Sequence, residues 1–338
     1  MPKHIAAFGE VMMRLQVPGF ELLSQGNLLK YSFSGTGVNV LTALSRYGHR
    51  GSLVSRLPGN SLGDAAAAYL RKLDIQTGHI QRGGSGIGMY FLENGFGPRP
   101  SRVSYSGRPQ SSFNTAPPDT YPFAELAKLA DAVHFCGITL AMNDEVRKAM
   151  KSYAEAVKQS GRWVVFDCNY RPSLWGEDAY ELARPHYEDM LHLADIVLMN
   201  EQDAMLILGM EAKGGSREEQ LQELIPAVVS RYNLNTVAGT HRSIHNDNRH
   251  SLRGYIFKAD RFAYSETLTF PVLDRVGAGD AYASGIIHGE LEGFAPQQTV
   301  AFAATAGMLA HAVEGDSPLA TEQEIIGVLT GAMRDVVR

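Results

Sequence analysis

Short apolar runs alternate with amphipathic stretches over most of the chain. Strand patterns fall at 5–8, 12–17, 51–56, 133–136, 163–167, 196–199 and 236–239, of which 12–17 reads as half-exposed. Helical patterns fall at 63–74, 144–159, 179–193, 202–208 and 217–231. Strands that alternate with helices are typical of a parallel sheet with helices on both faces. The pattern therefore predicts an α/β fold with three layers and a doubly wound, mostly parallel sheet.

Between residues 83 and 112 the helical period disappears. Glycines and aromatic residues surround two short β-type runs at 88–93 and 102–105. Extra strands beside an α/β body indicate a small β-layer over one end of it. We expect a single domain over 1–338, with a β-lid built from segments near 11–34 and 86–112 that would exclude water from a reaction. An ordinary β-insertion, packed on the body or on another subunit, is the alternative.

A glycine turn at the start of a late helix carries the clearest candidate chemistry. An apolar extended segment breaks into Gly277-Ala278-Gly279, and Asp280 stands where an alanine-rich helix begins. Glycine lets the backbone turn sharply and approach a bound group. The free N–H groups and the dipole of a helix N-terminus favour an anion such as phosphate. Asp280 could simply cap the helix, or it could accept the proton of a hydroxyl that attacks a phosphoryl group.

Other polar residues follow the carboxyl ends of the predicted strands. They are Asp167, Asn169 and Arg171 after one strand, Asn200 and Asp203 after the next, and Thr240 after a third. Ligands of open α/β sheets bind at this edge, so the coincidence predicts one site there. Near the start of the chain, the turn at 34–37 could present Gly35 and Asn39 to a small polar ligand. This turn could equally be an ordinary connection between a strand and a helix.

Composition narrows the function classes. With 31 basic and 36 acidic residues, the net charge of −5 disfavours a general nucleic-acid or membrane role. The chain contains no apolar run of about 18 residues, so we expect no membrane span. Cys136 and Cys168, both in apolar runs, fit a reduced cytoplasmic protein better than a disulfide framework. No Gly-Lys pair occurs, which excludes a P-loop.

Three histidines lie close together in the sequence. His241, His245 and His250 could suggest a metal site, but the run around them is rich in Asn, Asp and Arg. A solvated loop is the favoured interpretation.

Three segments carry a family resemblance. The chain resembles the ribokinase-like (PfkB-type) carbohydrate kinases over essentially its whole length, through SGTGVN at 34–39, NEQD at 200–203 and DRVGAGDAYASG at 274–285. The resemblance implies transfer of the γ-phosphoryl group of ATP to a sugar hydroxyl, with Asp280 as general base and the amides of 277–280 as the anion hole. It also implies a lid over the sugar and Mg²⁺ that accompanies ATP. Asn200 and Asp203 would help with this ion; Asp203 replaces the usual glutamate and would act through water.

Within that family the chain is similar to 2-keto-3-deoxygluconate kinases, through FDCNYRPSLW at 166–175, THRS at 240–243 and Gly315-Asp316. The resemblance implies that Arg108 and Arg171 contact a sugar acid, because a guanidinium matches a carboxylate and a neutral sugar needs no such partner. A solvated lid position for Arg108 and a helix-start or salt-bridge role for Arg171 are the alternatives. The remaining substrate residues would be Gly35, Asn39, Tyr90, Tyr105, Asn169 and Asp316, and the ATP contacts Asn200, Thr240, Gly277 and Gly279.

The sequence therefore predicts an ATP-dependent kinase of a small sugar acid, by resemblance one that converts 2-keto-3-deoxygluconate to its 6-phosphate. A kinase of a neutral sugar or nucleoside and a non-catalytic binding protein on the same scaffold are the alternatives. An exposed β-layer often pairs with its copy, so we also expect a homo-oligomer, such as a dimer through the lid.

Overall fold

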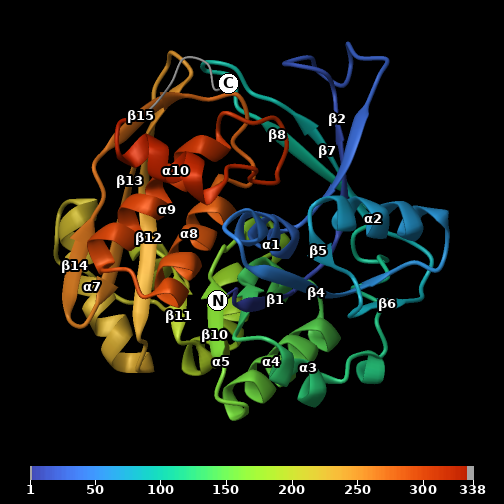
Figure 1. The fold of residues 1–338 in the computed structure, drawn as a ribbon, viewed down its shortest axis with the longest axis horizontal. Coiled ribbons are helices and arrows are strands. Elements are labelled where there is room, and N and C mark those ends of the chain that lie inside the picture. Colours follow the sequence, from blue (N-terminus) through green and yellow to red (C-terminus); the bar gives the residue numbers. More distant parts are fainter. Residues whose placement is uncertain (1, 333–338) are drawn as a thin grey trace.

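A large sheet runs through the middle of the molecule in the computed structural model, which describes residues 2–332 (Figure 1). It contains 11 strands in the order β14-β13-β12-β11-β10-β9-β1-β4-β5, with β15 paired to β13 and β6 to β4. The strands are β1 (His4–Phe8), β4 (Arg50–Leu57), β5 (Ile75–Gln76), β6 (Ile80–Arg82), β9 (Ala132–Cys136), β10 (Trp163–Asp167), β11 (Ile196–Leu198), β12 (Thr236–Ile244), β13 (Arg249–Lys258), β14 (Arg261–Tyr264) and β15 (Leu268–Pro271).

Helices cover both faces of this sheet. They are α1 (Thr36–Arg46), α2 (Ser61–Lys72), α3 (Phe123–Leu129), α4 (Asp144–Gln159), α5 (Ala179–Leu193), α6 (Glu201–Leu206), α7 (Arg217–Tyr232), α8 (Ala278–Glu292), α9 (Pro296–Ala310) and α10 (Glu322–Leu329). Short 3-10 turns lie at Pro118–Thr120, Gly137–Ala141 and Pro172–Leu174.

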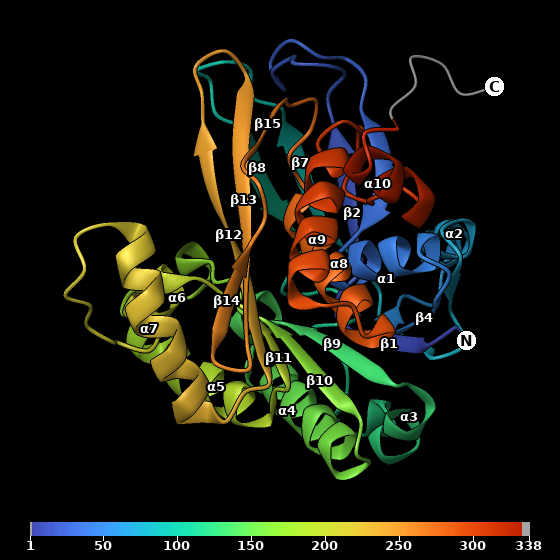
Figure 2. The same cartoon turned by 60° about the vertical axis from the view of Figure 1, so that its left-hand side comes forward.

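Alternation along β10 shows how the three layers form. Val164 and Phe166 belong to one apolar core, which α3, α4, α5, α6 and α7 complete. Val165, between them, belongs to a second core completed by α1, α2, α8, α9 and α10. Successive side chains of a strand point to opposite faces, so a continuous apolar run requires cover on both sides (Figure 2). The predicted three-layer, doubly wound fold is confirmed.

The parallel strands end at a common edge. Phe8 of β1 is in register with Val54 and Phe135, and Asp167 of β10 is in register with Cys136 and Leu198. The loops that follow these strands therefore meet at one edge of the sheet.

A second sheet stands beyond this edge (Figure 1). Its order is β3-β2-β7-β8, from β2 (Met12–Gln16), β3 (Lys30–Ser34), β7 (Gly88–Glu93) and β8 (Arg102–Ser106). The pair β2 and β7 is parallel, and the two outer pairs are antiparallel. We call these four strands the lid sheet.

Helix α8 packs closely against α9 because small residues meet between them. A Cβ on Gly285 would lie 2.5 Å from the Cα of Ala303, so the two backbones are nearly in contact. Every helical position from Ala278 to Glu290 is buried except Gly279. The start of α8 is thus held by a rigid helix pair.

The strands after residue 244 were not predicted. Residues 249–271 form β13, β14 and β15, which add antiparallel strands to one edge of the sheet. The expectation that a sheet strand leads directly into α8 was therefore wrong, because β15 ends at Pro271 and an irregular segment follows. Buried and more exposed positions alternate in the first half of β13, which is typical of a half-buried strand, but the polar run that includes its start was interpreted as a solvated loop.

The solvated-loop interpretation of the histidines was also wrong in part. His241 lies in β12 and His250 is buried in β13, whereas His245 lies in the turn between these strands. Within residues 2–332, no group of three or more His, Cys, Asp or Glu side chains could hold a metal ion. No helix in the described part of the chain is long and apolar enough to cross a membrane.

Candidate active site

A cavity of about 860 Å³ is lined by residues at the carboxyl edge of the main sheet and by residues of the lid sheet. All the candidate residues from the sequence line it: Gly35, Asn39, Tyr90, Tyr105, Arg108, Asn169, Arg171, Asn200, Asp203, Thr240, Gly277, Ala278, Gly279, Asp280 and Asp316. The volume is in the range of small-molecule sites.

The turn Gly277–Asp280, which we call the anion turn, begins α8. Gly277 has a φ of +83°, and a Cβ there would lie 1.8 Å from the carbonyl oxygen of Asp316. Only glycine fits this position. No side chain caps the helix, and within residues 2–332 the amides of 277–280 have no hydrogen-bond acceptor. These N–H groups are therefore available to an anion in the cavity.

Asp280 lies in the first turn of α8, where only 7% of the residue is exposed. Asn39, from the opposite helix α1, donates a hydrogen bond of 2.7 Å to its Oδ2 atom. Burial raises the pKa of Asp280 well above its usual value, although the hydrogen bond from Asn39 lowers it. Oδ1 has no partner in the described residues, so it is free to accept a proton. Asp280 does not cap α8 through its side chain.

Residues of the lid sheet line one end of the cavity, which we call the sugar end because the family resemblance implies that the sugar would bind there. Tyr90 of β7 is in register with Arg14 of β2 and Tyr105 of β8, which places the three in one row. The Tyr90 hydroxyl donates to Oδ2 of Asp316 and lies 3.1 Å from the Ser34 hydroxyl.

Arg108 is buried rather than solvated, with 6% of its surface exposed. Its Nε donates to Oε2 of Glu10 at 2.8 Å, and its guanidinium stacks 5.2 Å from the ring centre of Tyr105. Nη1 is buried and has no partner in the described residues. Glu10 thus fixes Arg108 while one donor remains for a ligand.

Three further guanidinium groups line the cavity without a carboxylate partner in the described residues. They belong to Arg171, Arg242 and Arg275. Arg171 donates only to the carbonyl oxygen of Tyr170. Desolvation and then the charges of Arg275 and Arg171 lower the pKa of Arg242, so Arg242 lies close enough to each of the other two to be repelled by it. Like charges collected around a cavity favour an anionic ligand.

The polar residues after β10 and β11 have defined local roles. Asn200 caps α6 through its Oδ1, and Asp203 accepts the Asn200 N–H at 2.8 Å, which completes a capping box. Burial raises the pKa of Asp203 to about 6 and that of Asp167 to about 7. The Asn169 Oδ1 atom, nearby, is buried without a partner in residues 2–332. Thr240 lies half-buried in β12.

Sequence reasoning did not single out Glu10, Arg14, Arg242, Asp274 or Arg275 as residues with a role in the site. The only signal for Arg14 was its place on the buried face of β2, between Met12 and Gln16. A charged residue at such a position requires a partner, but the sequence does not identify it.

The comparisons with known proteins agree with this geometry. Residues 2–322 match the pfkB family of carbohydrate kinases. A 2-dehydro-3-deoxygluconokinase structure from Thermotoga maritima is 32% identical, with a TM-score of 0.93, and covers 97% of this chain and 100% of its own. A candidate 2-keto-3-deoxygluconate kinase from Enterococcus faecalis is 38% identical, with a TM-score of 0.95, and covers 99% of each chain.

One curated relative is named for a different substrate. The 2-dehydro-3-deoxygalactonokinase of Haloferax volcanii is 27% identical over 98% of this chain and 98% of its own length. A turn whose amides are free in the described residues, beside a buried carboxylate at the edge of a doubly wound sheet, fits a kinase of small hydroxyl compounds. The chain belongs to the pfkB family of carbohydrate kinases.

Proposed function

We propose that this protein transfers the γ-phosphoryl group of ATP to a hydroxyl of a sugar acid, 2-keto-3-deoxygluconate, to form its 6-phosphate. The observation that carries the proposal is the charge arrangement of the cavity. One buried carboxylate, Asp280, adjoins amide donors that are free within residues 2–332. The guanidinium groups of Arg171, Arg242 and Arg275, which have no carboxylate partner in that range, line the same cavity. A triphosphate and a sugar acid together supply the anions that these groups need.

The anion turn would hold the transferring phosphoryl group. Its amides keep their direction because Gly277 is fixed against Asp316 and α8 is packed on α9. Donors that are aimed in advance stabilise charge as it develops, without reorganisation during the reaction. Thr240 and Asn200 line the same cavity and would contact the nucleotide.

Asp280 would act as the general base. The hydrogen bond from Asn39 holds Oδ2, which leaves Oδ1 to accept the proton of the attacking sugar hydroxyl. Because burial raises its pKa, the carboxylate is a stronger base than an exposed aspartate once it is ionised.

The donor set also fits Mg²⁺. Burial, together with the nearby charge of Asp203, raises the pKa of Asp167, and the partner-free Asn169 oxygen lies in the same cavity. Oxygen ligands of this kind suit a magnesium ion that keeps several waters, so Asp203 would act through water. When bound, the ion neutralises charge on the phosphates.

Arg108 and Arg171 support an acid rather than a neutral sugar. Both line the cavity, and both retain a guanidinium donor that no carboxylate in the described residues accepts. Gly35, Tyr90, Tyr105 and Asp316 would complete the sugar pocket. We propose the glucono acid, and its galactono isomer is the nearest competitor because the two differ in the configuration of one hydroxyl group.

The test is release of ADP from the purified protein with ATP, Mg²⁺ and a panel of acceptors. The panel contains 2-keto-3-deoxygluconate, 2-keto-3-deoxygalactonate, gluconate, fructose and ribose. We expect the highest kcat/KM with 2-keto-3-deoxygluconate. A preference for fructose or ribose would contradict the acid assignment, and no turnover with any acceptor would favour a binding protein.

Replacement of one arginine sharpens the test. Arg171→Ala should raise KM for the acid by about 10- to 100-fold, because it removes a charge-assisted contact, and should change KM for a neutral hexose much less. Arg231→Ala is the matched control, since Arg231 pairs with Glu188 at 2.7 Å outside the cavity. An equal effect of Arg171→Ala on both substrates would identify this arginine as structural.

We further propose that residues 1–338 act as one unit in which the lid sheet closes over the sugar, and that the protein is a homodimer through this sheet. Tyr31, which is 62% exposed, supports the second point because it offers apolar surface there. Size-exclusion chromatography with light scattering tests it. The free thiols of Cys136 and Cys168 agree with a reducing, cytoplasmic location.

A further inference from the structure

Arg14 is the most deeply buried arginine in the described part of the chain. It lies in the middle of β2 with 1% of its surface exposed, and it does not itself line the cavity. A buried guanidinium must be paired and hydrogen-bonded, since leaving it alone in the interior is costly. The partners of Arg14 therefore show which groups this buried guanidinium holds in place.

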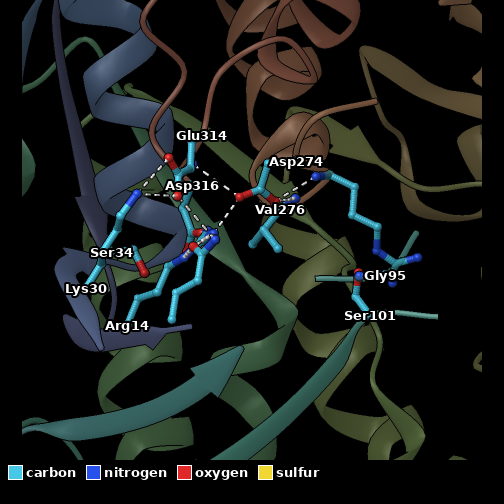
Figure 3. A network of polar contacts seen from close by, with 12 residues as sticks. Arg14, Lys30, Ser34, Gly95, Ser101, Asp274, Val276, Glu314 and Asp316 are labelled. Atoms are coloured by element: carbon cyan, nitrogen blue, oxygen red, sulfur yellow. Dashed lines mark hydrogen bonds and ion pairs between the residues drawn. The ribbon is translucent and has the colours of Figure 1, made fainter. Parts of the chain in front are cut away.

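The guanidinium of Arg14 joins two carboxylates that come from distant parts of the chain. Nη1 donates to Oδ1 of Asp316 and Nη2 donates to Oδ2 of Asp274 (Figure 3). The remaining donor, Nε, is held by Oε1 of Gln16 at 3.0 Å. Burial alone would lower the pKa of Arg14, but the charges of Asp316 and Asp274 raise it, so the group stays ionised.

Asp274 connects this pair to the anion turn. Its Oδ1 accepts the N–H groups of Arg275 at 2.7 Å and Val276 at 3.1 Å, and its Oδ2 accepts that of Gly315 at 3.1 Å. The segment that leads into Gly277 is thus tied to the loop that carries Asp316.

Asp316 connects the same pair to the sugar end of the cavity. Its carboxylate lines the cavity, and the hydroxyl of Tyr90 holds the oxygen that Arg14 does not. Its carbonyl oxygen is the atom against which Gly277 is packed. Arg14, a single residue of the lid sheet, therefore fixes the Asp316 carboxylate at the sugar end and, through Asp316, the backbone against which the anion turn is packed.

We propose that Arg14 is a positioning residue for phosphoryl transfer, which sets the distance and direction between the sugar hydroxyl and the anion turn. It acts through Asp316, held ready to accept hydrogen bonds from the sugar, and through Asp274, which holds the anion turn. This inference rests on the proposed kinase function. Reactions of this kind are sensitive to displacements of about 1 Å, so a small shift of either carboxylate should slow transfer.

Arg14→Lys is the first test, because a lysine keeps the charge but cannot bridge two carboxylates with a planar fork. We expect kcat/KM for the sugar acid to fall by about 30-fold or more, with a rise in KM for the sugar and a fall in kcat. The Kd for ATP, measured by calorimetry without sugar, should stay within about threefold of the wild type, since the amides themselves remain. Arg231→Lys is the matched control, and it should have wild-type kinetics.

Gln16→Met is the second test, and it keeps the inference falsifiable if Arg14→Lys does not fold. It leaves the charges of Arg14, Asp274 and Asp316 in place and lies outside the cavity. It removes the acceptor that orients the guanidinium, together with a 3.4 Å hydrogen bond from Gln16 to Glu314. We expect a smaller loss of the same kind, about 3- to 10-fold in kcat/KM for the sugar acid.

A purely structural role predicts different results. All assays are made at least about 20 °C below the measured Tm of each variant, because a margin of this size keeps the variant folded during the assay. Wild-type kcat and KM in the folded variants under these conditions would overturn the inference. A wild-type protein that phosphorylates none of the acceptors would instead overturn the proposed function.

Discussion

Replacement of Asp280 by asparagine tests the chemical step directly. The two side chains have the same shape, and the amide oxygen of the new side chain can still accept the 2.7 Å hydrogen bond from Asn39. The packing of α8 and the free amides of the anion turn should not change. The variant therefore removes a proton acceptor and a buried negative charge, and little else.

The size of the effect follows from this. Loss of a general base lowers kcat by on the order of 10² to 10⁴, or about 3 to 5 kcal/mol in the barrier. The folded pKa of Asp280 is raised, so its ionisation opposes folding above that pKa. The uncharged asparagine removes this penalty, and we expect the Tm of the variant at pH 8 to equal or exceed that of the wild type.

The assay is ADP release against pH, with the Kd for ATP measured in parallel. In the wild type, kcat/KM should rise with pH as Asp280 ionises, and this limb should be absent in Asp280→Asn. Asp119→Asn, an exposed aspartate, is the control. Turnover of Asp280→Asn within about tenfold of the wild type would refute the base assignment, because it is less than such a group contributes.

Two further predictions concern stability. Gly277→Ala should lower the free energy of unfolding by about 1 to 3 kcal/mol and abolish most activity, because φ at this position is +83° and the new Cβ would meet the Asp316 carbonyl oxygen. The measurement is chemical denaturation. Gly279→Ala is the control for stability, since a Cβ there meets no atom within 4 Å. Burial lowers the pKa of His49 to about 4 and also lowers that of His288, whose Nδ1 lies 2.9 Å from His49 Nε2. As the pH falls, the unfolded chain therefore binds protons at these histidines before the folded protein does. The stabilising effect of the two neutral histidines is complete above their ordinary pKa of 6.5 and is lost towards pH 4. Tm should therefore fall less steeply over this pH window in His49→Gln than in the wild type.

The alternation of apolar runs predicted the main sheet because it reflects a local rule. A strand such as 163–167 must be covered on both faces, and helices between parallel strands provide the cover. The convergence of Asn169, Asn200 and Thr240 on one cavity follows equally from the sequence. Asn169 and Asn200 follow parallel strands, and Thr240 lies in β12 just beyond its parallel pairing with β11, which ends at Ala238. The start of β13 escaped prediction because the polar run around residues 241–250 was interpreted as a solvated loop, although alternation along β13 is itself a strand pattern.

The sequence by itself determined the fold class, the anion turn and the set of polar residues available to the site, because apolar periodicity, glycine turns and helix starts are local properties. Only the tertiary structure decided which of these residues pair. Arg14 lies 302 residues from Asp316 and 260 from Asp274, and nothing near Arg14 in the chain indicates that it holds both. These contacts form only when the lid sheet packs near the start of α8, because a buried charge can pair only with groups that the tertiary structure brings close to it.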